Sequence, residues 1–83
     1  MAEETPARDL LEYLAEGLVE EPDAVSVEQF EQGDGTVVLE LSVDDDDYGR
    51  VIGRGGRTAR ALRTVVKAAA AADDRRVLVD IVD

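Results

Sequence analysis

The stretch YGRVIGRGGRTAR, residues 48–60, carries the most informative pattern in this chain. Residues 48–52 are long enough for one or two packed helical turns, a loop with Gly53 and Gly56 at its ends follows, and a longer helix begins at Arg57. Glycine at both ends lets the backbone approach the phosphates of another chain with no Cβ in the way. Backbone N–H groups at the start of the next helix favour an anion there. The stretch therefore predicts two helices joined by a phosphate-binding loop.

After the loop, the sequence predicts an amphipathic helix over residues 57–72 and a strand over residues 76–82. At about 100° per residue, the cationic side chains of this helix fall within roughly a third of its circumference, and apolar side chains take the remainder. We expect the apolar side to pack on a sheet and the cationic side to face outward. The cationic side comprises Arg57, Arg60, Arg63, Thr64 and Lys67, and the apolar side comprises Leu62, Val65, Val66, Ala69 and neighbouring alanines.

Before the loop, the chain begins with a predicted helix that ends before Pro22. Thr5 and Pro6 suit its N-cap and first position, because proline lacks the N–H group that would have no partner there. Leucines at helical spacing form an apolar stripe, with glutamates on the opposite side. The stripe comprises Leu10, Leu11, Leu14, Leu18 and Val19, and the glutamates are Glu12, Glu16 and Glu20.

A β-hairpin is predicted between this first helix and the loop. Its strands span residues 25–30 and 36–43, and a glycine-containing turn at residues 32–35 joins them. Of the four aspartates at 44–47, we expect one to be an N-cap and the others to favour the helix dipole or remain solvated, since the run lacks the pattern of a calcium loop. The order helix, strand, strand, helix, helix, strand predicts an α+β fold, a three-stranded sheet with its helices on one face.

Length and composition favour a single binding domain over an enzyme. The 83 residues suffice for one domain, in which we expect residues 1–5 to be a flexible terminus. Because the chain has no cysteine and no histidine, no metal site, cofactor or enzymatic activity is predicted. The acidic N-terminus and the lack of a long apolar run predict a cytoplasmic protein without membrane contact.

Charge is strongly segregated along the chain. The net charge of -11 by itself disfavours a nucleic-acid partner. Residues 1–47 carry sixteen acids and one base, however, whereas residues 48–83 carry eight bases and four acids. Between Arg50 and Lys67 there are six cationic residues and no acid. A generally acidic composition explains the N-terminal acids but not this segregation, which predicts one positive face on a negative body.

Three other interpretations of the loop were open on the residues alone. A Walker A loop needs Gly-Lys followed by Ser or Thr, which residues 53–58 do not supply. A dinucleotide-binding loop needs a surrounding βαβ unit and a third glycine. A tight turn between helices, without a ligand, fits the glycine spacing, but six neighbouring cations without a counter-acid favour a binding site.

Residues 51–57, Val-Ile-Gly-Arg-Gly-Gly-Arg, resemble the KH signature, an Ile-Gly-x-x-Gly loop between two helices. The order of elements resembles the type II KH fold, and the length, the leucine helix, the hairpin and the ending Val-Asp-Ile-Val-Asp make the chain similar to small bacterial single-KH proteins of the KhpA family. The resemblance implies RNA binding, a role as RNA chaperone or post-transcriptional regulator, and a link to cell shape through elongation and division. It also implies a homodimer, or a heterodimer with the larger KH-containing partner KhpB (Jag).

The resemblance also implies which residues contact single-stranded RNA. Gly53 and Gly56 match the outer loop glycines, and Arg54 matches the usual cationic position. Gly55 departs from the more usual side-chain-bearing residue, so we expect a more flexible loop with one contact fewer. Val51, Ile52 and one face of the second strand are expected to line a base groove or to lie in the core. The residues predicted to bind RNA are Gly53, Arg54, Gly55, Gly56, Arg57, Arg50, Arg60 and Ile52.

A second hypothesis makes the chain a protein–protein adaptor, with a KH-like fold and an acidic face that docks a basic partner without direct RNA contact. Neutralising Glu12, Glu16 and Glu20 should weaken an adaptor but spare an RNA-binding protein. Whether binding depends on the acidic or on the basic residues therefore separates the two hypotheses.

Overall fold

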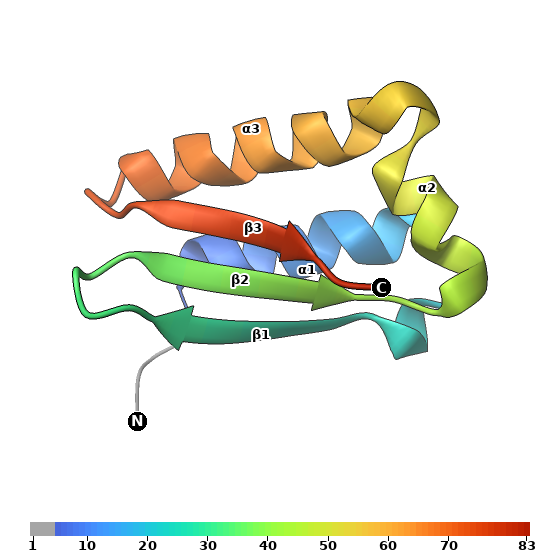
Figure 1. The fold of residues 1–83 in the computed structure, drawn as a ribbon, viewed down its shortest axis with the longest axis horizontal. Helices are drawn as coiled ribbons and strands as arrows, with labels where there is room; N and C mark the ends of the chain where they lie inside the picture. The colour runs from blue at the N-terminus through green and yellow to red at the C-terminus, as the bar shows by residue number, and fades with distance from the viewer. Residues whose placement is uncertain (1–4) are drawn as a thin grey trace.

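In the computed structural model, which describes residues 5–83, the elements follow the predicted order (Figure 1). Residues 1–4 of the predicted flexible terminus lie outside the described part. The helices are α1 (Pro6–Leu18), α2 (Tyr48–Ile52) and α3 (Arg57–Ala71), the strands are β1 (Ser26–Glu31), β2 (Val37–Ser42) and β3 (Val77–Ile81), and the short 3-10 turns are η1 (Pro22–Ala24), η2 (Asp45–Asp47) and η3 (Arg54–Gly56). None of the helices within residues 5–83 carries an apolar stretch that could span a bilayer.

The three strands form one mixed sheet in the order β1-β2-β3. β1 and β2 pair antiparallel as the predicted hairpin, with Val27 opposite Leu41. β3 runs parallel to β2, with Val79 opposite Leu39. Because a parallel pair needs a long crossover connection, α2, the loop after it and α3 carry the chain from the end of β2 to the start of β3. The predicted α+β class with a three-stranded sheet is confirmed.

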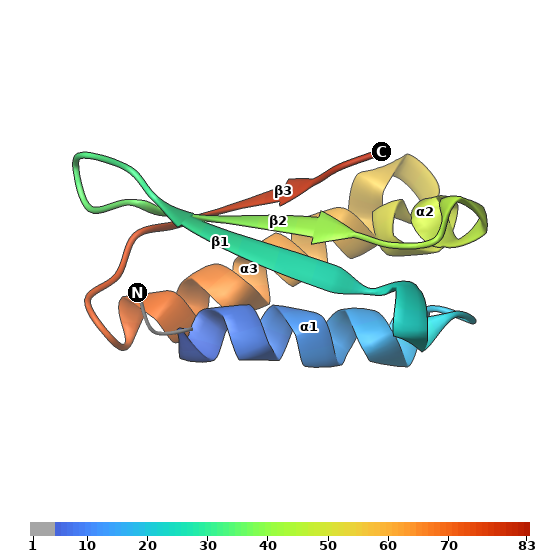
Figure 2. The ribbon, with the colours of Figure 1, turned by 90° about the horizontal axis from the view of Figure 1, so that it is seen from below.

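Both long helices lie on the same face of the sheet, which leaves the opposite face bare (Figure 2). Side chains alternate along the strands, so Leu39, Leu41 and Val79 point inward and are at most 7% exposed. Leu11 of α1 and Val66 of α3 pack against them and are fully buried. The core therefore lies between the sheet and the helix pair. The glycine-rich segment lies at one end of the molecule, between α2 and α3, which are both anchored in this core (Figure 1).

α1 begins where the sequence predicts. Its N-cap is Thr5, whose Oγ1 accepts a hydrogen bond from the backbone N of Arg8 at 3.1 Å. The leucine stripe is only partly buried, because Leu11 lies in the core whereas Leu18 in the last turn is 40% exposed. The stripe thus continues past the edge of the core and onto the surface.

α3 has three sides where the sequence predicts two. Leu62 and Val66 are buried as expected, but Val65 is 46% exposed, so the prediction that it packs on the sheet is wrong. Successive helical residues differ by about 100°, which turns Val65 from the sheet toward the side where α1 lies. The helix therefore has a buried side, a cationic side and an exposed apolar side.

Candidate nucleic-acid interface

The loop between α2 and α3, residues 53–56, requires glycine at its first position. Gly53 has φ 76° and ψ 168°, a backbone conformation open only to glycine. A Cβ at this position would collide with the Oγ1 of Thr58 and would lie 2.8 Å from the backbone N of Thr58. Thr58, which the sequence does not single out, thus closes the inner side of this glycine loop.

Gly55 and Gly56 are both in the left-handed region, with φ 63° and 78°. That region costs other L-residues about 1–2 kcal/mol. A Cβ added at Gly55 would meet nothing within 4 Å, so the backbone conformation and not crowding favours glycine there. The outer surface of the glycine loop is consequently open to solvent.

Some backbone N–H groups of the glycine loop are hydrogen-bonded within the protein and others are not. The N–H of Gly53 donates to Gly49 O at 2.9 Å, and the N–H of Gly56 donates to Gly53 O at 3.1 Å. The N–H groups of Arg54 and Gly55 donate to no backbone acceptor within residues 5–83. Because these two donors precede the positive end of α3, the loop offers them to an external acceptor.

Arg54 and Arg57 are the free cations of the site. Both side chains are exposed, and neither forms an ion pair with a carboxylate in the described part of the chain. Their charges therefore stand uncompensated in the same short segment as the two free N–H groups, those of Arg54 and Gly55.

Arg50 and Arg60 differ from them, because each binds the protein itself. Arg50 Nη2 donates to Glu20 Oε1 at 2.6 Å, and its Nε lies 3.2 Å from Asp47 Oδ1. Arg60 Nη2 donates to the carbonyl oxygen of Gly55 at 2.6 Å. The four arginines predicted to contact phosphate thus separate into a free pair and a pair that braces the site.

Asp47 is a residue of this site that sequence reasoning missed. It is 2% exposed, and its carboxylate accepts from the backbone N of Glu20 at 3.2 Å and of Glu21 at 3.1 Å. With Arg50, these bonds fasten the start of α2 to the chain that leaves α1. One of the four aspartates is expected to be an N-cap, and Asp44 caps the turn η2. The expectation that the others favour the helix dipole or remain solvated is wrong for Asp47. No group of three or more carboxylates within residues 5–83 is arranged to hold a metal ion.

The two apolar residues before the loop have different surroundings. Val51 is fully buried in the core, as are Leu39 and Leu41 on the inner face of β2. Neither Val51 nor that face of the second strand can therefore line a base groove. Ile52, the last residue of α2, is half-buried and directly precedes the glycine loop.

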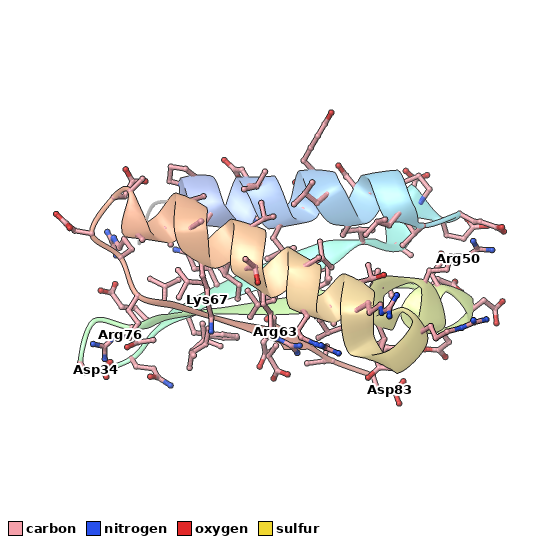
Figure 3. All side chains as sticks on the ribbon, turned by 90° about the horizontal axis from the view of Figure 1, so that it is seen from above. Asp34, Arg50, Arg63, Lys67, Arg76 and Asp83 are labelled. Carbon is pink, nitrogen blue, oxygen red and sulfur yellow. The ribbon has the colours of Figure 1, made fainter. Side chains whose placement is uncertain are left out.

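The positive surface continues from the glycine loop along α3. Figure 3 shows Arg63 and Lys67 on the side of α3 that faces away from α1, whereas Arg50 lies on the α1 side. Arg63 Nε donates to Val79 O at 3.2 Å and so lies against the edge strand β3. With Arg57 and Arg60 in the same third of the helix, these residues form the cationic side that the sequence predicts.

An apolar groove of about 600 Å³ lies between α1 and α3. Its exposed apolar residues include Tyr13 at 73%, Leu18 at 40% and Val65 at 46%. Leu14, Ala61 and Leu62 form much of its remaining lining. The groove is thus separate from the cationic side of α3, although Thr58 reaches both it and the glycine loop.

Comparison with known proteins places the chain among KH domains. The family model of the KhpA/KhpB KH domain matches residues 8–81. RNA-binding protein KhpA of Clostridium acetobutylicum is 47% identical over 75 residues, which cover 90% of this chain and 99% of that protein. The KhpA of Halalkalibacterium halodurans is 50% identical over 76 residues, covering 92% and 99%. The KhpA of Streptomyces coelicolor is 52% identical over 75 residues, covering 90% of each chain.

Solved structures of Era share the fold. Era in complex with MgGDPNP and a segment of 16S ribosomal RNA has a TM-score of 0.62 and 17% identity, covering 90% of this chain and 28% of that one. A variant of Aquifex aeolicus Era bound to GDP·AlF4⁻ has a TM-score of 0.62 and 17% identity, covering 98% and 32%. This chain spans about a third of those proteins, and the likeness concerns the fold alone.

Proposed function

The chain belongs to the KhpA/KhpB family of KH domains, and on that premise we propose that it binds single-stranded RNA. The glycine loop lies against the sugar-phosphate backbone, Arg54 and Arg57 contact phosphates, and Ile52 contacts a base. The observation that carries the proposal is the combination, on one solvent-facing turn, of two free N–H groups and two arginines without an internal counter-charge.

This arrangement supplies what a phosphate requires. Arginine offers forked donors that can bind two phosphate oxygens at once, and charge-assisted hydrogen bonds of this kind are roughly twice as strong as neutral ones. The absence of side chains at Gly53, Gly55 and Gly56 lets the backbone N–H groups reach the same anion. A KH domain holds about four nucleotides in this way, with the bases in a neighbouring groove.

Arg50 and Arg60 hold α2 and the glycine loop in position for this contact. Because Glu20 and Asp47 neutralise Arg50, we assign it the task of positioning α2. Arg60 holds the Gly55 carbonyl while its charge remains uncompensated, so it serves both the loop and, secondarily, the RNA. Arg63 and Lys67 extend the path of the RNA along α3 toward β3.

Binding by one such domain is weak and only loosely specific for sequence. If about three phosphates are neutralised, log affinity falls against log salt concentration with a slope near −2, at about 0.7 for each phosphate of a single strand. These properties suit an RNA chaperone or post-transcriptional regulator, and we infer that residues 1–83 contain one KH domain.

The proposal is tested by the double variant Arg54→Asp, Gly55→Asp. Aspartate tolerates the left-handed backbone at position 55, and a Cβ has room there, so the circular dichroism and Tm should stay near wild type. RNA binding should be lost. As a control, Gln32→Asp with Gly33→Asp adds two aspartates to the hairpin turn and should leave RNA affinity within about twofold. Unchanged RNA affinity in the loop variant would contradict the proposal.

Self-association is proposed to use the apolar groove between α1 and α3. Its three most exposed apolar side chains, Tyr13, Leu18 and Val65, would be covered by a second copy, and two linked loops would bind one RNA at a raised effective concentration. A larger KH-containing partner would compete for the same groove. Val65→Glu should therefore lower the molar mass measured by light scattering, whereas Ala68→Glu, also exposed on α3, should not. Equal molar masses for wild type and Val65→Glu would rule this groove out.

A further inference from the structure

The bare face of the sheet carries two parallel rows of side chains that run across all three strands. Each outward position lies beside its partner in the next strand, so the rows follow from the register. One row is apolar and consists of Phe30, Val38 and Leu78; the other is acidic and consists of Glu28, Glu40 and Asp80.

The apolar row is exposed, and neither long helix covers it. Phe30 is 47% exposed and Leu78 is 45% exposed, and half-buried Val38 lies between them. Figure 2 shows that both long helices lie on the other side of the sheet. A single exposed apolar residue is ordinary, but an apolar row across the full width of a sheet indicates a contact surface.

The acidic row has no counter-charge of its own. Like charges directly opposite each other in neighbouring strands destabilise a sheet. Nevertheless, none of Glu28, Glu40 and Asp80 forms an ion pair with a cation in residues 5–83. A cationic partner would relieve this repulsion, and a polyanion such as RNA would be repelled.

We propose that this face binds a basic amphipathic helix of a partner protein, laid across the strands. Strands are about 4.8 Å apart and a helical turn rises about 5.4 Å, so one lysine or arginine per turn can meet one carboxylate per strand. The two rows are two residues apart along each strand, about 7 Å, which places the apolar residues of the same helix over Phe30, Val38 and Leu78. Charge and shape thus fit the same occupant.

This surface differs from the other proposed contacts. The loop between α2 and α3 lies at one end of the molecule, and both long helices lie on one face of the sheet (Figure 2). The groove is lined by those helices, whereas the alternation of side chains along the strands points both rows to the opposite face of the sheet. It also differs from the α1 glutamates that the adaptor hypothesis considers. The chain can therefore hold RNA and a basic helix at the same time.

The test uses a labelled helical peptide of about 18 residues, long enough to form a helix, with lysines in one helical row and leucines in the adjacent row. It is titrated into the full chain at low ionic strength, and NMR follows the backbone amides of the chain. Shifts should gather on the outward residues of β1, β2 and β3. A peptide with glutamates in place of the lysines should bind at least about tenfold more weakly.

Two variants decide whether both rows take part. Neutralising the acidic row with Glu28→Gln, Glu40→Gln and Asp80→Asn should weaken the lysine peptide about tenfold. The matched control Glu16→Gln, Glu21→Gln, Asp23→Asn removes equal charge from exposed positions elsewhere and should change affinity less than about twofold. Phe30→Ser with Leu78→Ser should also weaken binding. Equal loss in the acidic-row and control variants, no loss in the serine variant, or shifts confined to α1 would each overturn the proposal.

Discussion

The hairpin turn (residues 32–35) and the glycine loop (residues 53–56) are both short and glycine-rich, but they differ in charge, because the hairpin turn carries Asp34 and the glycine loop carries Arg54. In the hairpin turn, the N–H of Gln32 donates to Thr36 O at 2.8 Å and the N–H of Gly35 donates to Gln32 O at 2.9 Å. The N–H of Thr36 donates to Asp34 Oδ1 at 2.9 Å. The one charged side chain of the turn is therefore bonded within the turn, whereas the N–H groups of Gly33 and Asp34 donate to no backbone acceptor within residues 5–83.

The glycine loop also leaves two N–H groups unused, but they lie next to cations and not next to a carboxylate. The N–H groups of Arg54 and Gly55 and the side chains of Arg54 and Arg57 have no partner within the described residues. Glycine content alone therefore does not distinguish a structural turn from a binding loop. The distinction lies in the sign of the charge beside the free N–H groups and in whether that charge is bonded internally, and the following changes test it.

The largest effect is expected from Gly53→Ala. The new Cβ would collide with Thr58 and would force a backbone conformation that costs a non-glycine residue about 1–3 kcal/mol. The free energy of unfolding, measured with urea, should fall by at least that amount. Gly33→Ala, in the hairpin turn, has open space and should change it by less than about 0.5 kcal/mol. Equal stability of the two variants would contradict the described loop geometry.

The next effect concerns RNA binding and separates the free arginines from Arg50. Arg54→Ala with Arg57→Ala should weaken RNA binding and make the salt slope less negative by about 1.4, because two phosphate contacts are lost. Arg50→Ala should leave the slope within about 0.3 of wild type, since Glu20 and Asp47 already neutralise that charge. Fluorescence anisotropy across a salt series measures both. A larger slope change for Arg50→Ala would reverse the assigned roles.

A smaller, favourable effect is expected from Gly55→Lys. Its side chain has open space and would add a cation next to Arg54, at a backbone cost of about 1–2 kcal/mol. RNA affinity at low salt should rise about two- to fivefold, as one further phosphate contact would allow. Gly35→Lys, which places the same side chain at φ 87° in the hairpin turn, should leave RNA affinity unchanged. Equal gains in the two variants would indicate a general charge effect.

The smallest effect concerns Asp34. The hydrogen bond from the backbone N–H of Thr36 holds the pKa of Asp34 below its ordinary value of 3.8. The ionised form is therefore favoured in the folded state, and its contribution is present above pH 3.8 and lost as the pH falls through the lowered pKa. Asp34→Asn should slightly flatten the acid limb of the stability curve, measured by urea unfolding at several pH values, and leave RNA affinity unchanged. A steeper acid limb would contradict this hydrogen bond.

The sequence predicts the glycine loop and its helices because the decisive signals are local. Thr5 and Pro6 mark the start of α1, and the glycines mark the break between α2 and α3. The ion pair of Arg50 is not predictable in this way, because its partner Glu20 lies 30 positions away. Likewise, Asp47 binds backbone N–H groups 26 and 27 positions away, so nothing in a run of four aspartates distinguishes it.

The exposure of Val65 could not be predicted either, because it also depends on contacts between distant elements. Helical periodicity places apolar residues on a broad arc, but it does not say how much of that arc the sheet covers. In this fold the sheet covers Leu62 and Val66, whereas Val65 turns to the groove beside α1. Packing between elements, and not the pattern within one element, decides which apolar residues stay at the surface.

We propose that free N–H groups beside unpaired cations make the glycine loop, and not the hairpin turn, the RNA contact. NMR of the uniformly 15N-labelled chain, titrated with a single-stranded RNA of about eight nucleotides, tests this directly, since a KH domain holds about four. We expect the largest amide shifts at Arg54 and Gly55 and none at residues 32–35. RNA that shifts the hairpin turn as strongly as the glycine loop, or that leaves Arg54 and Gly55 unmoved, would contradict the account.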